Sequence, residues 1–315
     1  MINKIFGNSR LPTSSLIFIL FIVQALFNLG NVRAVPVEGE AEEPSKNDES
    51  NFDYATMCGK RQEADEDPQG RITGGTEAAF GDWPWMVYIM NNAENPKVFV
   101  HMGGGSLLNK NWAVTAGHLF DHYKSTQILL RFGELDRFKE TEPLQHVERT
   151  IEELHLYPSY NKRTYENDIA LIKFSAVPIQ RHIRPVCLPA KVRDYDREPV
   201  TVTGWGQIIE DGAQPDILLQ AEVEVINNIQ CENMFFQAHI YADIFDTIIC
   251  AGYQRGGKDS CKGDSGGPLV YCRPDTNQYE VIGVVSNGYG CGEEFPPGIY
   301  TRVTSFLPWI NGIYK

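Results

Sequence analysis

Short runs of β-branched and aromatic residues, separated by turn residues, dominate the chain after residue 75. Glycine, proline, asparagine and aspartate stand between the runs, and these residues favour turns. Many short strands with such spacing are typical of a β-sandwich or β-barrel, so we predict an all-β fold. The runs that we assign to strands are 85–90, 105–108, 112–115, 128–132, 169–174, 200–203, 218–226, 267–271, 279–286 and 299–303.

Helical patterns occur in two places. Four apolar residues between 306 and 313 stand at positions i, i+3, i+4 and i+7, with Thr304 or Ser305 as the candidate cap. A shorter helix is predicted over residues 227–236. We expect the C-terminal helix to dock on the β structure through its apolar stripe.

The N-terminal segment has the features of a targeting sequence. Lys4 and Arg10 precede an apolar run from Leu16 to Leu29, and a small-residue cleavage site follows. We therefore predict a signal peptide over residues 1–34 and a secreted, extracellular protein. An uncleaved anchor is the alternative, but a run of about 15 residues is shorter than the ~20 that a spanning helix needs.

The segment that follows, residues 35–71, is strongly acidic. It holds 11 Asp or Glu residues against 4 Lys or Arg, a net charge of −7, and few large apolar side chains. Such a segment buries too little apolar surface to order itself. We expect a flexible acidic pro-segment with Cys58 as its only covalent anchor.

Two properties of the whole chain narrow its partners and its environment. The formal net charge is −13, which argues against nucleic acid or an anionic membrane as partner, because both select basic surfaces. Seven cysteines in a secreted chain indicate a disulfide framework, and the odd number leaves one cysteine over.

A serine enclosed by glycines marks the candidate reactive site. Ser265 lies in the stretch 259–269, where neighbouring glycines let the backbone turn sharply. A serine hydroxyl needs a base to become a nucleophile, and the base needs an orienting group. His118 follows one predicted strand and Asp168 precedes another, so they are the candidates. Taken singly, each has a plainer interpretation: a glycine-rich turn, an isolated histidine and an aspartate that caps a turn.

The order His118, Asp168, Ser265 and nine short motifs make residues 72–315 resemble the trypsin-like serine proteases. The motifs are RITGG at 71–75, GGSLL at 104–108, TAGH at 115–118, NDIAL at 167–171, RPVCLP at 184–189, TGWG at 203–206, ICAG at 249–252, GDSGGP at 263–268 and PGIY at 297–300. This resemblance implies the chymotrypsin fold, with two antiparallel six-stranded β-barrels, the active site between them and a C-terminal helix. The barrels would span about 72–187 and 188–315.

The resemblance also implies a role for each residue of the candidate site. Ser265 Oγ would attack the scissile carbonyl, His118 would accept and return the proton, and Asp168 would hold the imidazole tautomer. The backbone N–H groups of Gly263 and Ser265 would form the oxyanion hole. Glycine at 263 leaves space for the incoming carbonyl because it has no Cβ.

Further positions match the substrate pocket of the family, namely Asp259, Ser286, Gly288 and Gly298. Asp259, six residues before Ser265, would form the base of the pocket, where a carboxylate favours an Arg or Lys side chain. The two glycines would keep the pocket open. A surface aspartate in a turn is the alternative for Asp259. Asn287 replaces the tryptophan common at its position, which leaves the extended preference open.

Activation by cleavage between Arg71 and Ile72 follows from the same resemblance. The new Ile72 amine, largely charged at neutral pH, would pair with Asp264 and order the pocket and oxyanion hole. The uncut chain would be a zymogen, and residues 35–71 would become a light chain. Because Arg71 is itself basic, a trypsin-like partner or the enzyme itself could make the cut.

Family spacing implies three disulfides, Cys58–Cys187, Cys231–Cys250 and Cys261–Cys291, and leaves Cys272 unpaired. The first would tether the cut pro-segment to the peptidase domain. Gly103 and Leu119 stand in place of a familiar cysteine pair. For Cys272 three states stay open: a buried inert thiol, a bond to another chain, or a register shift that pairs it with Cys58.

Acidic residues at Glu134, Asp136, Glu140 and Glu142 fall where some relatives bind calcium. Oxygen ligands suit that ion, but the glutamate spacing differs from theirs, and a solvated acidic loop is the alternative. No organic cofactor is required, because water is the second substrate.

We therefore expect a secreted serine endopeptidase of trypsin type that cleaves protein or peptide substrates after Arg or Lys. A long, acidic, tethered pro-segment favours limited proteolysis in an extracellular cascade such as clotting or defence. Its partners would be an upstream activating protease and protease inhibitors. A digestive or venom protease and a catalytically silent binding homologue are the alternatives. The silent homologue would need a broken triad or oxyanion loop, and the sequence shows neither.

Overall fold

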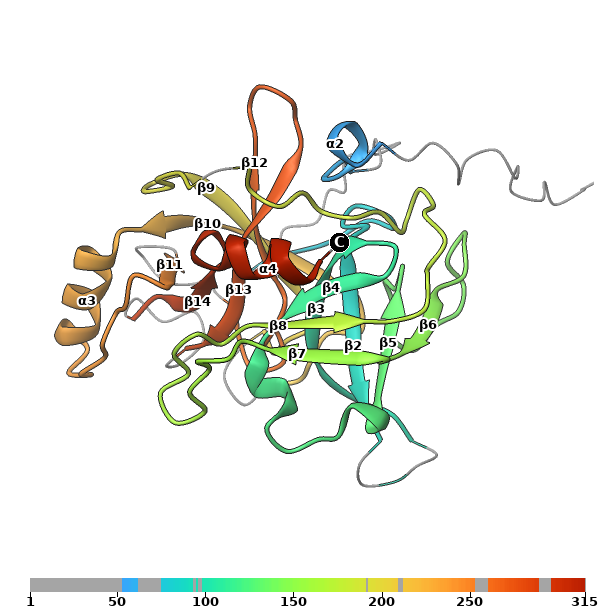
Figure 1. Ribbon diagram of the computed structural model, residues 1–315, viewed down its shortest axis with the longest axis horizontal. Helices are drawn as coiled ribbons and strands as arrows, with labels where there is room; N and C mark the ends of the chain where they lie inside the picture. Colours follow the sequence, from blue (N-terminus) through green and yellow to red (C-terminus); the bar gives the residue numbers. More distant parts are fainter. Residues whose placement is uncertain are drawn as a thin grey trace, which may run out of the picture. The chain divides into compact units, whose positions relative to one another are not determined.

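The computed structural model describes residues 53–61, 75–92, 95, 98–190, 192–208, 212–252, 260–288 and 296–314. In these residues the fold is mainly antiparallel β structure in two sheets (Figure 1). The prediction of an all-β, two-barrel fold with a C-terminal helix is confirmed. One sheet closes into a six-stranded barrel, and the other has seven strands and curls around its own core.

The first sheet has the strand order β6-β5-β2-β3-β4-β8-β7, and its neighbours are antiparallel. Its strands are β2 (Met86–Asn91), β3 (Val100–Asn109), β4 (Trp112–Thr115), β5 (Ile128–Phe132), β6 (Val147–Thr150), β7 (Glu153–Leu156) and β8 (Ala170–Lys173). Side chains such as Leu107, Val114 and Leu130 are completely buried between the curled walls. Burial of this apolar surface is the main force that holds the sheet in its curl.

The second sheet has the order β10-β11-β14-β13-β12-β9, and pairing of β9 with β10 closes it. Its strands are β9 (Pro199–Gly204), β10 (Leu219–Ile226), β11 (Ile248–Gly252), β12 (Pro268–Cys272), β13 (Tyr279–Asn287) and β14 (Gly298–Arg302). The short β1 (Thr76–Glu77) pairs with β10, although it precedes the first sheet in the sequence. Leu269, Ile282 and Tyr300 fill the barrel interior.

The predicted runs differ from the strands at some ends and omit four strands. β4 and β5 coincide with the predicted runs 112–115 and 128–132, whereas β3 starts at Val100 rather than at residue 105. The predictions do not include β1, β6, β7 and β11. β6 and β7 lie at the two edges of the first sheet and have no buried residue, so no apolar run marks them.

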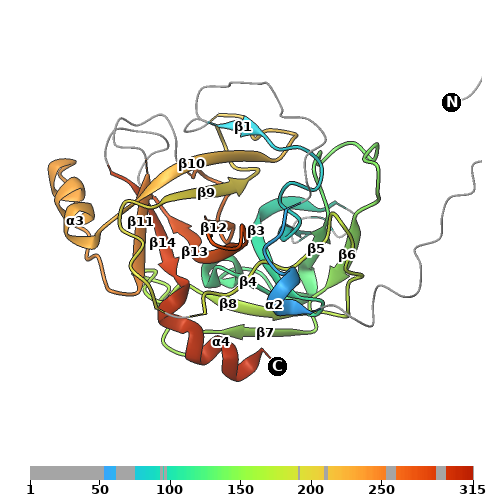
Figure 2. The ribbon, with the colours of Figure 1, turned by 90° about the horizontal axis from the view of Figure 1, so that it is seen from above.

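Helix α3 (Asn228–Gln237) lies beside β11 at the outer side of the closed barrel (Figure 2). The Asn227 side chain accepts a hydrogen bond from the backbone of Gln230, which satisfies one free N–H of the first turn. The Cys231–Cys250 disulfide fixes the helix to β11. This element agrees with the helix predicted over 227–236.

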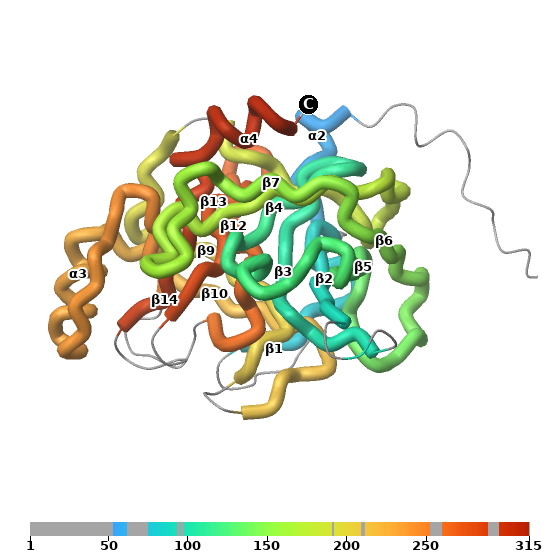
Figure 3. The backbone as a smooth tube through the Cα atoms, turned by 60° about the horizontal axis from the view of Figure 1, so that its bottom comes forward, coloured from blue at the N-terminus to red at the C-terminus, as the bar shows by residue number. Residues whose placement is uncertain are grey.

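Helix α4 (Leu307–Ile313) continues a 3₁₀ turn at Val303–Phe306. The expected cap at Thr304 or Ser305 is wrong, because both residues lie inside the 3₁₀ turn and the helix begins without a side-chain cap. Figures 2 and 3 show α4 beside β7, where Tyr157 makes edge-to-face contacts with the apolar stripe. In the described part of the chain no helix has the length and apolarity to span a membrane.

The described part of the acidic segment forms α2 (Tyr54–Met57) and lies against β13, where the Tyr279 N–H donates to the Gly59 carbonyl at 2.8 Å. Cys58 is buried and forms a disulfide with Cys187. Arg61 forms an ion pair of 3.0 Å with the buried carboxylate of Asp82 and stacks on an indole ring. The expected flexibility of the whole segment is therefore wrong for residues 53–61, since the disulfide, the ion pair and backbone hydrogen bonds hold them to other parts of the chain.

Candidate active site

His118 and Asp168 come together because two neighbouring strands carry them to the same end of the first sheet. His118 lies in the 3₁₀ turn (Gly117–Phe120) just after β4, and Asp168 lies two residues before β8. These strands pair, with Thr115 opposite Ala170. His118 Nδ1 is 2.7 Å from Asp168 Oδ2, and the backbone N–H of His118 donates to Oδ1 at 2.8 Å. One carboxylate therefore holds both the ring and its backbone.

The second barrel supplies two more hydrogen bonds to Asp168, whose side chain is completely buried. Ser286 Oγ donates to Asp168 Oδ2 at 2.6 Å, and Thr301 Oγ1 donates to the Asp168 carbonyl at 2.7 Å. The Ser286 hydroxyl offsets part of the cost of burying the carboxylate, whereas Thr301 holds the backbone of the same residue. From the sequence we assigned Ser286 to the substrate pocket and gave Thr301 no role. The hydrogen bonds could not be found there, because they join two separate sheets.

Ser265 lies in a tight turn that is clamped between both sheets. Its carbonyl accepts a hydrogen bond of 2.8 Å from the N–H of Gly104 in β3, and the N–H of Gly266 donates to Val285 in β13 at 2.8 Å. A Cβ on Gly104 would come within 3.1 Å of the Gly267 Cα. The glycine run of β3 therefore lets the turn that contains Ser265 pack directly against the first sheet.

A cavity of about 260 Å³ brings the candidate nucleophile and base together. It is lined by His118, Tyr165, Ser260, Cys261, Lys262, Ser265, Val285, Ser286, Asn287 and Gly288. Asp259 lies outside the described residues, and its neighbour Ser260 lines the cavity wall. Gly298, the remaining position of the predicted pocket, begins β14.

Tyr165 is a cavity residue that we did not anticipate. Its backbone has a φ of 55°, and its ring stands edge-on to His118 at 5.5 Å. A positive φ is unfavourable for a bulky residue, so the surrounding loop fixes this conformation. The ring covers one side of the imidazole and narrows the cavity. No pattern in the sequence marks this position.

The Gly263 carbonyl is held by a histidine, His101, to which we assigned no role from the sequence. Gly263 has a φ of 102°, in the region open mainly to glycine. Its carbonyl is 2.8 Å from His101 Nε2, which must carry the proton because a carbonyl only accepts. His101 stacks on Tyr88 at 4.8 Å, and burial lowers the pKa of the imidazole to about 4. The ring is therefore neutral at physiological pH.

Asp264 follows Gly263 in the chain and lines a small cavity next to β9 and β10. Oδ1 accepts a hydrogen bond from the Gly206 N–H at 2.7 Å, and Oδ2 accepts one from the Cys261 N–H at 2.9 Å. Burial raises the pKa of this carboxyl from 3.8 to about 6. The cavity beside it has a volume of about 40 Å³, and Gly75 lies in its wall. Arg71 and Ile72 lie outside the described residues.

Two of the three expected disulfides are present among the described residues, Cys58–Cys187 and Cys231–Cys250. Cys261 is also disulfide-bonded, and its expected partner Cys291 lies outside the described residues. Cys272 is a free, partly exposed thiol that donates to Asn277 Oδ1 at 3.3 Å. The alternative pairing of Cys272 with Cys58 is therefore wrong.

Comparison with known proteins supports the resemblance to the trypsin-like serine proteases along most of the chain. The trypsin family model matches residues 72–310. The chain is 40% identical to the serine proteinase stubble of Drosophila melanogaster over 244 residues, which cover 77% of this chain and 31% of stubble. It is 38% identical to human testisin over 251 residues, 76% of this chain and 77% of testisin. It is 34% identical to the venom serine protease Bi-VSP of Bombus ignitus over 279 residues, 83% and 75% of the two chains. This chain thus spans about a third of the length of stubble.

Proposed function

Because this chain belongs to the trypsin family of serine proteases, we propose that it hydrolyses peptide bonds through an acyl-enzyme on Ser265. The observation that carries the proposal is a cavity lined both by Ser265 and by a histidine that a buried carboxylate orients. A serine hydroxyl becomes nucleophilic when such a base accepts its proton. The proposal covers the endopeptidase activity and the order of proton transfers.

In the proposed reaction His118 works through its Nε2 atom, because Nδ1 is engaged by Asp168 at 2.7 Å. Nε2 accepts the proton of Ser265 Oγ as that oxygen forms a bond to the scissile carbonyl carbon. The imidazolium then gives the proton to the leaving amine as the C–N bond breaks. A water molecule then attacks the carbonyl carbon of the acyl-enzyme while Nε2 accepts its proton. The proton passes to Ser265 Oγ as the bond between Oγ and the acyl carbon breaks, and the carboxylic acid product leaves. Asp168, whose carboxylate is held by the His118 N–H, His118 Nδ1 and Ser286 Oγ, stabilises the imidazolium.

The oxyanion formed in each step is assigned to the backbone N–H groups of Gly263 and Ser265. Loss of one such donor costs about 3 kcal/mol in comparable sites. Contacts on both sides of Gly263 support this assignment. The Gln207 N–H donates to the Lys262 carbonyl at 2.9 Å, which orients the peptide that carries the Gly263 N–H, and His101 holds the carbonyl of Gly263 itself. The charge that develops in the transition state would then meet donors that are already in place.

Cleavage after Arg or Lys is part of the same proposal. Asp259 is covalently linked to Ser260, a residue of the cavity wall, and a carboxylate there would pair with a basic substrate side chain. Gly288 lines the same cavity and leaves room for a long side chain. The substrates would be proteins or peptides with Arg or Lys before the cleaved bond.

Activation is proposed at the bond between Arg71 and Ile72. In the uncut chain residue 72 carries an amide, so it offers no charge to Asp264, whose two contacts are backbone N–H groups. A free Ile72 amine in the adjoining cavity would supply the missing counter-charge. The raised pKa of Asp264 supports this step, because it shows that the carboxylate is costly to ionise there.

The setting that we propose is extracellular, with the protein secreted and acting by limited proteolysis in a cascade. The disulfides support an oxidising compartment, and Cys58–Cys187 would retain the light chain after cleavage. An upstream protease would make the activating cut, and protease inhibitors would end the activity. A catalytically silent binding protein is the outcome to be distinguished by experiment.

The test is to cut the purified chain at Arg71 and to profile it on a library of peptide amides, with Ser265→Ala as the matched control. We expect activity only after the cut, a preference for Arg or Lys, and none in the control. An inert cut chain, or a control that stays active, would contradict the enzyme proposal. A preference for aromatic residues would refute only the role of Asp259.

A further inference from the structure

The loop between β5 and β6, residues 133–146, contains the acidic residues that fall where some relatives bind calcium. Its acidic residues Glu134 and Asp136 are only 6% and 7% exposed, so the alternative of a solvated acidic loop is wrong for these two. Buried carboxylates need a counter-charge or several hydrogen bonds. The nature of that counter-charge decides what holds the loop together.

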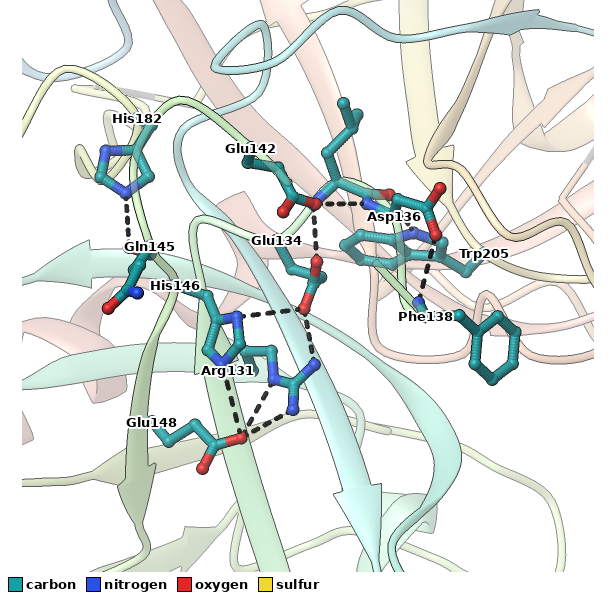
Figure 4. Close-up of polar contacts among 11 residues, drawn as sticks. Arg131, Glu134, Asp136, Phe138, Glu142, Gln145, His146, Glu148, His182 and Trp205 are labelled. Atoms are coloured by element: carbon teal, nitrogen blue, oxygen red, sulfur yellow. Dashed lines mark hydrogen bonds and ion pairs between the residues drawn. The ribbon is translucent and has the colours of Figure 1, made fainter. Parts of the chain in front are cut away.

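Arg131 of β5 supplies the counter-charge from within the chain (Figure 4). Its Nη1 atom is 2.7 Å from Glu134 Oε2, while Nε and Nη2 donate to Glu148 Oε1 at 3.1 and 2.8 Å. The remaining Glu134 oxygen accepts the Leu135 N–H at 3.1 Å. His146 completes the cluster, with Nδ1 3.6 Å from Glu134 Oε2. One guanidinium thus bridges a carboxylate of the loop, Glu134, and a carboxylate of β6, Glu148.

The other acidic residues turn to different donors. Asp136 accepts hydrogen bonds from the Phe138 N–H at 3.1 Å and from Lys139 Nζ at 2.8 Å. Glu142 Oε1 accepts the Asp136 N–H at 3.1 Å, and Glu140 is exposed. In the described residues no three Asp, Glu, His or Cys side chains are arranged to hold a metal ion.

A dication placed among these carboxylates would lie beside the permanent charge of Arg131, which does not deprotonate in proteins. Glu134 would have to give up a 2.7 Å charged hydrogen bond to coordinate it. The residues present therefore do not fit calcium. The guanidinium fills the need for positive charge that the buried Glu134 creates.

This loop is also joined to the second barrel. The Leu135 carbonyl accepts hydrogen bonds from Trp205 Nε1 and from the Leu218 N–H, both at 3.0 Å. The Arg137 N–H donates to the Asp216 carbonyl at 3.0 Å. Residues 135–137 therefore cannot shift without moving the segment around 214–218.

Two routes lead from these contacts to Gly263. In one, Arg137 Nη1 donates to Gln214 Oε1 at 3.1 Å, and the Gln214 amide nitrogen would be 2.5 Å from a Cβ on Gly263. In the other, Trp205 packs edge-on against Tyr88 at 5.0 Å, and Tyr88 stacks on the histidine that holds the Gly263 carbonyl. Both routes start in the loop that the Arg131 ion pair closes.

We propose that Arg131 is the built-in cation of this loop in place of calcium, and that it positions Gly263 through Trp205 and Gln214. The second half rests on the oxyanion role proposed for Gly263, whereas the first half is independent of it. Arg131 acts here as a positioning residue, since it touches neither substrate nor the reacting atoms.

The test compares the wild type with Arg131→Gln, Arg131→Lys and the control Arg193→Gln. Arg193 also pairs with a glutamate, at 2.6 Å, but belongs to the segment before β9. For each cut protein, melting temperatures are measured in EDTA and in millimolar calcium, and kcat and KM are measured on a peptide amide. Arg131→Lys keeps the charge but cannot bridge two carboxylates in the same way.

We expect the wild type to melt at the same temperature in calcium and in EDTA. Arg131→Gln should melt roughly 10 °C lower, because it leaves Glu134 buried without its partner. Its kcat should fall about tenfold with little change in KM, less than the loss of an oxyanion donor. Arg131→Lys should recover part of both effects, and Arg193→Gln should match the wild type in kcat.

Each half has its own contrary result. A wild type that gains stability from millimolar calcium would refute the built-in cation. A kcat of Arg131→Gln no lower than that of Arg193→Gln would refute the positioning role. If Arg131→Gln does not fold, the kcat of Arg131→Lys is compared with that of Arg193→Gln instead. An inert wild type would contradict the proposed protease function instead, while the calcium comparison would still decide the first half.

Discussion

Replacement of Asp264 by asparagine in the uncut chain tests how the second barrel carries a buried charge before activation. The experiment uses a background of Arg71→Gln, so that the chain stays uncut. Asp264→Asn removes the ionisable group but keeps its size. One of the two N–H donors, from Gly206 or Cys261, then faces the asparagine amide, which lowers stability equally at every pH. Only the pH dependence is therefore compared.

The expected size follows from the position of the carboxyl. Burial holds its pKa at about 6 in the folded chain, against 3.8 ordinarily. Between these values the folded chain keeps a proton that the unfolded chain releases, so the free energy of unfolding falls as the pH rises. The difference between the two pKa values corresponds to about 3 kcal/mol. Water reaching Asp264 through the adjoining cavity lowers this to about 2 kcal/mol.

The measurement is urea unfolding of both proteins from about pH 4 to about pH 7. The difference in unfolding free energy between Asp264→Asn and its parent should rise by about 2 kcal/mol in favour of the variant over this range. In a second pair of proteins that keep Arg71 and are cut there, the Ile72 amine should keep the carboxylate ionised, and the rise should disappear. Parallel curves for the two uncut proteins would refute the argument that Asp264 is a costly buried charge.

Three further predictions concern other residues, each changed in a chain that keeps Arg71. Ser286→Ala removes the 2.6 Å hydrogen bond to Asp168 and should lower kcat about tenfold with KM unchanged; an unaltered kcat would show that the bond does not matter. The double change Cys58→Ser and Cys187→Ser opens a bond that spans 129 residues and should lower the melting temperature by roughly 10 °C. On a non-reducing gel the cut variant should release its N-terminal fragment, whereas the parent should not. Burial lowers the pKa of the His101 imidazole from 6.5 to about 4, so the free energy of unfolding of the parent should fall as the pH falls through that range. His101→Gln should remove this fall. An unchanged dependence of the unfolding free energy on pH would contradict the burial of a neutral ring.

Much of the fold was open to prediction because the signals are local. The runs that became β4 and β5 match to the residue, and the helix predicted over 227–236 agrees with α3 to within one residue at each end. Runs of β-branched and aromatic residues bounded by turn residues depend only on neighbouring residues. Where the signal is weak, as in the exposed edge strands β6 and β7, the prediction fails.

The site divides in the same way. His118, Asp168 and Ser265 stand in motifs with recognisable spacing, so their proximity could be anticipated from a resemblance. The residues that hold them could not. Thr301 and His101 act through single hydrogen bonds to backbone carbonyls, at Asp168 and Gly263. A contact between a side chain and a distant backbone atom leaves no trace in spacing or composition.

Asp168 carries a consequence for how the two sheets depend on each other. Its carboxylate orients His118 from the first sheet, and its remaining contacts come from Ser286 and Thr301 in the second. A buried carboxylate that loses a donor becomes costlier to ionise, and it then holds the imidazolium less well. Small displacements of one sheet against the other should therefore change the orientation of Asp168 and, with it, that of the His118 imidazole. The hydrogen bond from the Gly104 N–H to the Ser265 carbonyl joins the sheets a second time. If Ser265 and His118 act as the proposed nucleophile and base, the rate should respond to mutations that loosen the contacts between the sheets even when neither residue is changed.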